Sequence, residues 1–388
     1  MKGISDHDSH ADLREGVRAL CNPFDSAYWQ KVDEERGYPE AFVDALTKAG
    51  WLSALIPEEY GGSGLPLTAA SVIMEEINRS GGNSGACHGQ MYNMGTLLRH
   101  GSEAHKRQYL PRIASGELRL QSMAVTEPTA GTDTTRITTT AVRKGDRYVV
   151  NGQKVWTSRV QHSELMILLA RTTPHTEVKK KSEGMSIFIV DLREAMKKGL
   201  TVKPIRNMVN HETNELFFDN LEIPAENLIG EEGKGFKYIL DGLNAERILI
   251  AAECIGDGYW FIDRATRYAT ERVVFDRPIG RNQGIQFPIA RAYVNVEGAN
   301  LMRFKAAALF DEKKPCGAEA NMAKLLGADA SWEAANVCLQ TYGGFGFAAE
   351  YDVERKFRET RLYQVAPIST NLILSYIGEH VLGMPRSF

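Results

Sequence analysis

The stretch that constrains the fold of this chain most strongly reads Ala124-Val125-Thr126-Glu127-Pro128-Thr129-Ala130-Gly131-Thr132-Asp133. It crowds hydroxyl groups, an acid, a proline and a glycine into one short segment, which is typical of a binding turn rather than a buried strand. Thr126 and Thr132 can each donate and accept hydrogen bonds, and Gly131 lets the backbone approach a ligand closely.

A second stretch, Gln340-Thr341-Tyr342-Gly343-Gly344-Phe345-Gly346-Phe347, places paired glycines beside aromatic residues near the C-terminus. This pattern is typical of a helix that ends against something flat. Either stretch alone is a weak signal, whereas their order, spacing and neighbours together are specific.

The composition predicts a globular protein of more than one domain. The chain has 388 residues, which exceeds one ordinary core, and a hydrophobic content of 43%. A net charge of −3 without a long block of like charges argues against a nucleic-acid surface. No apolar run of about 18 residues occurs, so no membrane span is predicted.

The cysteines and the N-terminus together predict a cytoplasmic protein. Five cysteines stand apart and none forms a C-x-x-C pair, so neither a zinc ribbon nor a disulfide framework is indicated. Residues 1–8 are acidic and polar, without the apolar core of a signal peptide or the arginine-rich character of a transit peptide.

Helices are expected up to about residue 120. A helix is predicted from Pro39 to Gly50, because proline often begins a helix and glycine often ends one, and another from Thr68 to Asn78. Lys106–Leu110 is expected to lead into Pro111 and a short helix that ends at Gly116.

The hydrophobic period becomes strand-like between about residues 121 and 230. Asn151-Gly152, directly after Tyr148-Val149-Val150, predicts a hairpin turn. Further strands are predicted over Leu165–Ala170, Ser186–Val190 and Glu215–Phe218.

Long helices return beyond Gly235 and predict a bundle. They are expected over Phe236–Glu271, Gln286–Asp311, Ala318–Gly343 and Ser369–Leu382. Helices, then strands, then helices indicate an α+β chain of three domains, at residues 1–120, 121–232 and 233–388.

From about residue 35 to its end, the chain resembles the acyl-CoA dehydrogenases. The resemblance implies an N-terminal helical domain, a β-barrel-like middle domain and a C-terminal four-helix bundle, with FAD between the last two. It also implies a base that removes the α-proton of an acyl-CoA while the β-hydride goes to flavin N5. Electrons then pass to an electron-transfer flavoprotein.

The flavin segments of that family carry over position by position. Lys154-Val155-Trp156-Thr157-Ser158-Arg159 is similar to the second flavin segment, in which Trp156 would cover the isoalloxazine and Ser158 would supply a hydroxyl near N5. This copy departs from the usual Trp-Ile-Thr-Asn at Thr157, Ser158 and Arg159. Within one chain the resemblance implies flavin contacts from Met123, Val125, Thr126, Gly131, Thr132, Trp156, Thr157, Ser158, Ser369 and Asn371.

Other matching positions imply that FAD is shared between subunits. Glu271–Ile279 is similar to the segment that reaches a neighbouring subunit's FAD, with Arg272 on the pyrophosphate. The remaining cross-subunit contacts would be Phe275, Gln283, Gln340, Gly343 and Gly344. A homo-oligomer, usually a tetramer in this family, is therefore expected.

The position of the base separates this chain from many of its relatives. Their glutamate falls at Pro367 here, and proline cannot act as a base. The isovaleryl-CoA and long-chain enzymes instead carry a glutamate directly before an arginine on a bundle helix, which corresponds to Glu246 and Arg247. By the same resemblance, Thr132, Leu243, Asn244 and Arg247 would contact the substrate.

The residues around Glu246 support this role independently. Leu243, Glu246 and Ile250 share one helical face, and the following segment 248–252 is apolar on every side. A carboxylate on such a face is costly unless it is paired or functional, and burial favours its protonated form, which suits a base near neutral pH. The alternative is a structural ion pair with a lysine or arginine of another helix. Gln90, Met91, Tyr92 and Met94 are expected to border the acyl pocket.

Pro367 keeps other functions open. In the family the backbone N–H at this position helps to hold the substrate carbonyl, and proline has no N–H. Either the amide of Ile368 replaces this donor or the chemistry differs. The alternatives are a flavin oxidase or monooxygenase on the same fold and a non-catalytic acyl-CoA-binding relative.

Overall fold

The computed structural model describes residues 10–386, and the chain forms two compact units. A helical unit comprises Met1–Glu35, Pro66–Ser84 and Asn244–Phe388, and a sheet unit comprises Arg36–Leu65 and Gly85–Leu243. The helix that spans Gly235–Glu271 contributes to both units.

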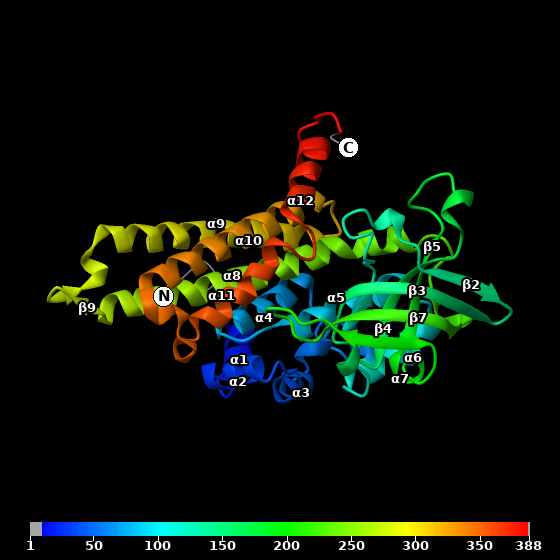
Figure 1. Ribbon diagram of the computed structural model, residues 1–388, viewed down its shortest axis with the longest axis horizontal. Coiled ribbons are helices and arrows are strands. Elements are labelled where there is room, and N and C mark those ends of the chain that lie inside the picture. The colour runs from blue at the N-terminus through cyan, green and yellow to red at the C-terminus, as the bar shows by residue number, and fades with distance from the viewer. Residues whose placement is uncertain (1–9, 387–388) are drawn as a thin grey trace. The chain divides into compact units, whose positions relative to one another are not determined.

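The helical unit is built on three long helices (Figure 1). These are α8 (Gly235–Glu271), α9 (Gln283–Asp311) and α10 (Gly317–Tyr342). Its shorter elements are α1 (Ala11–Cys21), α2 (Ser26–Glu34), α4 (Leu67–Arg79), α11 (Val353–Arg361), α12 (Thr370–Tyr376) and the hairpin of β9 (Val273–Val274) and β10 (Arg277–Pro278).

Apolar side chains of the three long helices meet in one core. Phe261 on α8, Val296 on α9 and Ala334 on α10 belong to the same buried cluster. Small residues on α10 let the helices approach closely, which favours dense packing. No helix of residues 10–386 is both long and apolar enough to span a membrane.

The sheet unit combines four helices with an eight-stranded sheet, whose strands pair in the order β6-β7-β3-β2-β4-β5-β8 while β1 pairs in parallel with β4. Its helices are α3 (Glu40–Lys48), α5 (Gly85–His100), α6 (Glu103–Ala114) and α7 (Leu192–Ala195). Its strands are β1 (Ser122–Ala124), β2 (Thr140–Lys144), β3 (Arg147–Ser158), β4 (Leu165–Arg171), β5 (Met185–Asp191), β6 (Leu200–Pro204), β7 (Thr213–Pro224) and β8 (Leu228–Ile229).

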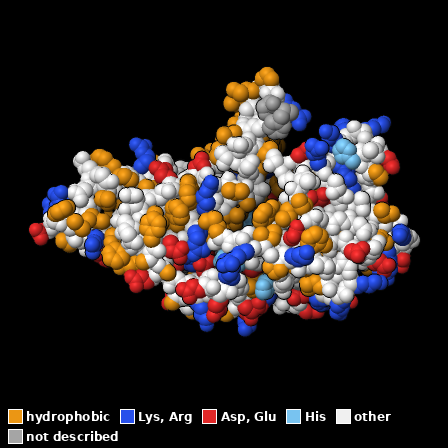
Figure 2. Space-filling view, in the orientation of Figure 1, with side chains coloured by type: hydrophobic (Ala, Val, Ile, Leu, Met, Phe, Trp, Pro, Cys, Tyr) orange, Lys and Arg blue, Asp and Glu red, His pale blue; other side chains and the backbone are white. Residues whose placement is uncertain are grey.

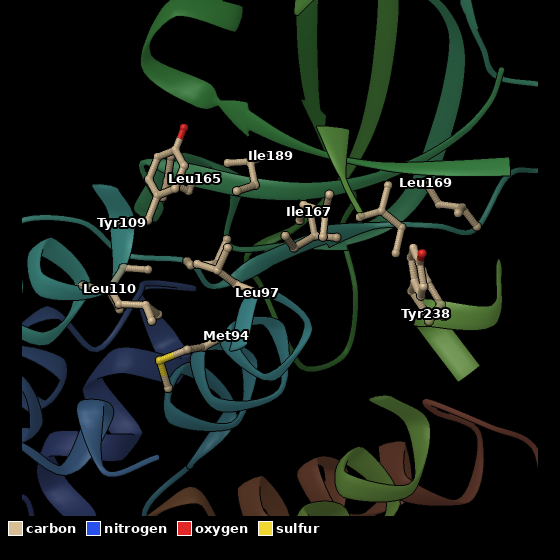
Figure 3. Close-up of a cluster of buried hydrophobic side chains, with 14 of the residues drawn as sticks. Met94, Leu97, Tyr109, Leu110, Leu165, Ile167, Leu169, Ile189 and Tyr238 are labelled. Atoms are coloured by element: carbon tan, nitrogen blue, oxygen red, sulfur yellow. The ribbon is translucent and has the colours of Figure 1, made fainter. Parts of the chain in front are cut away.

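Strand β4 is buried on both faces, as its continuous apolar run indicates. Leu165, Ile167 and Leu169 point into one cluster, together with Met94 of α5 and Leu110 of α6 (Figure 3). Alternate residues of the same strand belong to a second cluster on the other face. The two clusters hold α5 and the strands in fixed positions.

Two predictions of local structure are wrong. Asn151-Gly152 lies inside β3, and the turn between β2 and β3 falls at Gly145-Asp146, because Lys144 pairs with Arg147. A glycine at position 152 instead lets β3 pass close to Thr139, since a Cβ there would lie 2.5 Å from Thr139 Oγ1. Pro111 does not begin a new helix, because α6 runs continuously through it.

Candidate active site

The segment after β1 folds into a turn that the buried side chain of Glu127 stabilises. The backbones of Glu127 and Ala130 hydrogen-bond to each other in both directions. The Glu127 carboxylate accepts hydrogen bonds from the backbone N–H of Thr138 at 2.6 Å and of Thr139 at 2.9 Å. The buried Glu127 side chain therefore holds the turn in one defined shape.

Lys154 of β3 ties this turn to the second flavin-like segment. Its side chain is 0% exposed and donates to the Val125 carbonyl at 2.8 Å and to the Glu127 carboxylate at 2.9 Å. Burial lowers the pKa of Lys154 to about 8, against the opposing effect of Glu127. The backbone N–H of Val155 also donates to the Thr126 carbonyl at 2.9 Å, so the two segments form one rigid body.

Trp156 stands out from β3 on a bulge. The pairing of β3 with β7 shifts register between Lys154 and Thr157, which inserts one extra residue in β3. Trp156 has φ 62°, an outlier for a bulky residue, and its side chain is 59% exposed. A strained, exposed indole beside a rigid turn offers a flat surface to a ligand.

The Ser158 hydroxyl is oriented by its neighbours. Asn210 Nδ2 donates to Ser158 Oγ at 2.9 Å, and Thr213 Oγ1 lies 3.4 Å away. Because Ser158 Oγ already accepts from Asn210, its proton is directed toward other acceptors. Thr157 is buried, and among the described residues its hydroxyl has no hydrogen-bond partner.

The sheet unit thus brings together the flavin-binding residues predicted for it. Gly131 and Thr132 are exposed, and a Cβ at Gly131 would meet nothing within 4 Å. An open glycine, a directed hydroxyl and an exposed indole fit a flat, hydrogen-bonding group such as the flavin of FAD. Met123, Val125 and Thr126 are half-buried in the same segment.

Glu246 lies on α8 where the helix becomes buried on every side. Its side chain is 8% exposed, and residues 248–252 are buried, as the apolar sequence predicts. It lies close enough to Lys324 of α10 to act on the pKa of that lysine. The helical unit therefore holds a desolvated carboxylate at the position expected for the base.

Lys324 fixes the loop that carries Pro367. Its Nζ is fully buried and donates to the carbonyls of Tyr363 at 2.6 Å and of Ile368 at 2.8 Å. Burial lowers the pKa of Lys324. The peptide bond between Ala366 and Pro367 is cis. Among the described residues, the backbone N–H of Ile368 donates to no acceptor, so it is available to a ligand.

The predicted substrate residues Leu243, Asn244 and Arg247 lie on α8, and the predicted flavin contacts Ser369 and Asn371 lie at the start of α12. Arg247 donates to Asn244 Oδ1 at 3.0 Å, and burial lowers the pKa of its guanidinium. Leu243 is partly buried in the sheet unit's cluster. Ser369 caps α12 by accepting from the backbone N–H of Leu372 at 3.4 Å, and Asn371 lies in the first turn of that helix.

Two of the residues predicted to reach the FAD of another subunit line a hollow of about 450 Å³ at the end of α10. Arg272 and Gly344 line it, and the Arg272 guanidinium lies 5.6 Å from the centre of the Phe345 ring. Phe275, at the tip of the β9–β10 hairpin, is 93% exposed. Gln340 and Gly343 adjoin the hollow at the end of α10, and Gln283 begins α9 with an exposed side chain.

The two buried lysines and Glu127 were missed by the sequence interpretation. Lys154 stands two residues before Trp156, and Glu127 lies inside the first quoted stretch, so both were visible as charges within apolar surroundings. Their pairing was not visible, because it depends on the register of distant strands. Lys324, in an alanine- and leucine-rich helix, carried the same signal.

Comparison with known proteins gives a consistent result along the chain. The N-terminal, middle and C-terminal domain models of the acyl-CoA dehydrogenases match residues 7–117, 122–221 and 233–382. Cyclohex-1-ene-1-carbonyl-CoA dehydrogenase of Syntrophus aciditrophicus is 36% identical over 355 residues, which cover 91% of this chain and 84% of that protein.

Solved structures agree with this result. A glutaryl-coenzyme A dehydrogenase in complex with glutaryl-CoA superposes with a TM-score of 0.90 at 32% identity, covering 97% of this chain and 96% of the other. A chain of the structure described as the electron transferring flavoprotein of Acidaminococcus fermentans has a TM-score of 0.90 at 29% identity, covering 96% of this chain and 97% of that chain.

Proposed function

Because the chain belongs to the acyl-CoA dehydrogenase family, we propose that it dehydrogenates an acyl-CoA thioester between Cα and Cβ, with Glu246 as the base. The observation that carries this proposal is the buried position of Glu246 on α8 together with the absence of a carboxylate at Pro367. The product would be the trans-2-enoyl-CoA.

The residues of the sheet unit would bind and orient FAD, which when bound accepts the hydride from Cβ. Trp156 would cover one face of the ring, Ser158 would donate to it, and Gly131 would leave room for the cofactor. The clamp of Lys154 on the Val125 carbonyl would keep these groups fixed, which lowers the cost of ordering them on binding.

The residues of the helical unit would handle the proton and the carbonyl. Glu246 would take the proton from Cα, from a buried position on α8. The free N–H of Ile368 would donate to the thioester carbonyl in place of the donor that Pro367 lacks. Lys324 would hold that amide in place through the Ile368 carbonyl.

The active protein would be a homo-oligomer. Light scattering, which measures the molar mass in solution, would test this. The exposed tip at Phe275 and the hollow beside Arg272 support a contact with FAD of another subunit. Hydrophobic side chains lie on the surface of the long helices (Figure 2). Separately, Val294 and Leu301 of α9 and Leu326 of α10 are exposed. A stable monomer with full FAD occupancy would contradict this part of the proposal.

Replacement of the base tests the proposal. Glu246→Gln keeps the shape of the side chain but removes its ability to accept a proton, so flavin reduction by acyl-CoA should slow by roughly 10²–10⁴-fold while FAD content stays unchanged. Glu253→Gln is the matched control, because Glu253 is a second buried acid on the same face of α8. A near-normal reduction rate in the Glu246 variant, or equal losses in both variants, would place the base elsewhere.

A further inference from the structure

Arg159 lies directly after the proposed flavin contact Ser158, at the start of a short helix that spans Val160–His162. Its backbone is left-handed, with φ 61°, and its main chain is fixed because its N–H donates to the Glu212 carbonyl at 2.9 Å. The side chain therefore leaves the sheet from one defined point.

The guanidinium reaches the surface of α5 at Gly89. A Cβ on Gly89 would lie 2.9 Å from one Arg159 Nη and 3.2 Å from its Nε. The same Cβ would lie 3.0 Å from the Gln121 carbonyl oxygen. Gly89 thus provides the space that the guanidinium occupies, one residue before the stretch of α5 that is expected to border the acyl pocket.

The other enclosed cations of the sheet unit are all compensated. Lys154 pairs with Glu127 at 2.9 Å, and Arg119 pairs with Glu40 at 2.6 Å and with Asp44 at 2.7 Å. Arg171 donates to four backbone carbonyls, those of Thr135, Ile137, Lys181 and Glu183. Each of these cations therefore has a structural reason to be buried.

Arg159 differs from them. Its Nε is enclosed without a hydrogen-bond partner, and within residues 10–386 its guanidinium forms no hydrogen bond, although the side chain as a whole is only half-buried. A cation in such a place is costly unless a ligand supplies the acceptor. Its charge also acts on His162: burial lowers the pKa of this histidine, Glu212 and Glu40 oppose that effect, and Arg119 and Arg159 add to it.

We propose that Arg159 binds a carboxylate at the far end of the acyl group, so that the substrate is the CoA thioester of a dicarboxylic acid. This inference rests on the proposed function. A planar guanidinium matches a carboxylate in geometry and charge, and it gains much less from the methyl end of a simple fatty acyl chain.

Several side chains close to Arg159 are also polar. Tyr38 OH donates to Gln121 Oε1 at 2.6 Å, and Gln121 Nε2 donates to Gln90 Oε1 at 3.4 Å. Tyr38 also stacks on His162, with ring centres 4.2 Å apart. This chain of hydrogen bonds fixes the polar groups around the guanidinium, whereas a pocket for a fatty acyl terminus needs apolar walls.

The test uses pairs of acyl-CoAs of equal length, in which one member ends in a carboxylate and the other in a methyl group. The shortest pair is succinyl-CoA and butyryl-CoA, and the longest is adipoyl-CoA and hexanoyl-CoA. The readouts are the dissociation constant, measured in the Glu246→Gln background where turnover is blocked, and kcat/KM in the otherwise wild-type holoenzyme. Wild type should prefer the carboxylate partner of at least one pair. Arg159→Asn, which suits the left-handed backbone, should reduce that preference by roughly 10–100-fold and leave the methyl-ended partner within a fewfold.

Two further variants keep the test decisive if Arg159→Asn folds poorly. Gly89→Ala should displace the guanidinium without removing its charge, and so lower the preference in the same direction. Arg119→Gln removes an arginine that is already neutralised, and it should leave the preference unchanged. Preference of wild type for the methyl-ended partners, or equal losses for both partners in Arg159→Asn, would overturn the inference. Failure of every acyl-CoA to reduce the flavin would instead overturn the proposed function.

Discussion

Lys154 in the sheet unit and Lys324 in the helical unit are both fully buried, yet they are compensated differently. Lys154 has a carboxylate partner, Glu127, whose remaining lone pairs accept from the backbone of residues 138 and 139. Lys324 donates to two carbonyls, and no carboxylate of the described residues lies within ion-pair distance of it. The first arrangement is neutral and closed, and the second keeps its net charge.

A buried carboxylate in each unit also differs in the direction of its pKa shift. Burial acts to raise the pKa of Glu127, but Lys154 and the donors from Thr138 and Thr139 outweigh burial and lower it. Burial raises the pKa of Asp257 on α8 to about 6, although Lys356 lies 2.6 Å away. The comparison shows that a buried cation outweighs burial at Glu127, where backbone and side-chain donors assist it, but does not outweigh burial at Asp257.

Breaking the closed pair should have the largest effect. Lys154→Met removes the cation and leaves the Glu127 carboxylate buried, which should destabilise the protein by about 3–5 kcal/mol and release FAD. Thermal unfolding and flavin absorbance of the purified protein would measure both. The double variant Lys154→Met/Glu127→Leu should recover most of the stability but not the FAD affinity, because the Val125 carbonyl still lacks its donor. If the single variant is as stable as wild type, the pair is not closed as described.

Removing the uncompensated lysine should change rate more than stability. Lys324→Gln should lower flavin reduction at saturating acyl-CoA by roughly 10–100-fold with a smaller change in KM, because the Ile368 amide loses its support in the reaction. Lys356→Gln is the matched control, since Lys356 is equally buried and donates to the Gly82 carbonyl at 2.8 Å. The control should lose thermal stability but keep its rate. Equal rates in wild type and Lys324→Gln would make Lys324 purely structural.

The smallest effect is a pH dependence of stability in the helical unit. The native pKa of Asp257, about 6, is above the ordinary 3.8, so between these values the native state holds a proton that the unfolded chain has lost. Stability from this group is present below pH 4 and is lost as the pH rises through 6, at most on the order of 1 kcal/mol per pH unit. The melting temperature of wild type minus that of Asp257→Asn should therefore fall between pH 4 and pH 6. A difference that grows over this range would show that Lys356 outweighs burial.

The sequence was informative where local pattern decides the structure. The uninterrupted apolar stretch of α8 predicted both a long buried helix and the burial of Glu246, because these depend only on helical periodicity. Strands β4 and β5 were predicted because each is a short apolar run, which is also a local feature of the sequence. The family, and with it the three-domain fold, was confirmed by the domain models that match the chain.

The sequence was uninformative where distant segments meet. Asn151-Gly152 carries a turn signal, but pairing of β3 with β7 on both sides of it keeps the strand extended. The clamps of Lys154 on Val125 and of Lys324 on Ile368 join residues 29 and 44 positions apart, and neither spacing marks a contact. The lack of a hydrogen bond at Arg159 Nε became visible only in the structure, because it depends on how the distant residues Gly89 and Gln121 pack around the side chain. The domain boundaries and the roles of the site residues stay predictions.

The dehydrogenase function is tested most directly by mixing the purified wild-type protein with a panel of acyl-CoAs under nitrogen and following the absorbance of the bound flavin. The protein should be yellow, with one FAD per chain, and at least one acyl-CoA should bleach it. Its colour should return faster with an electron-transfer flavoprotein than with O2. Faster return with O2 would indicate an oxidase, and a flavin that no acyl-CoA bleaches would contradict the dehydrogenase function.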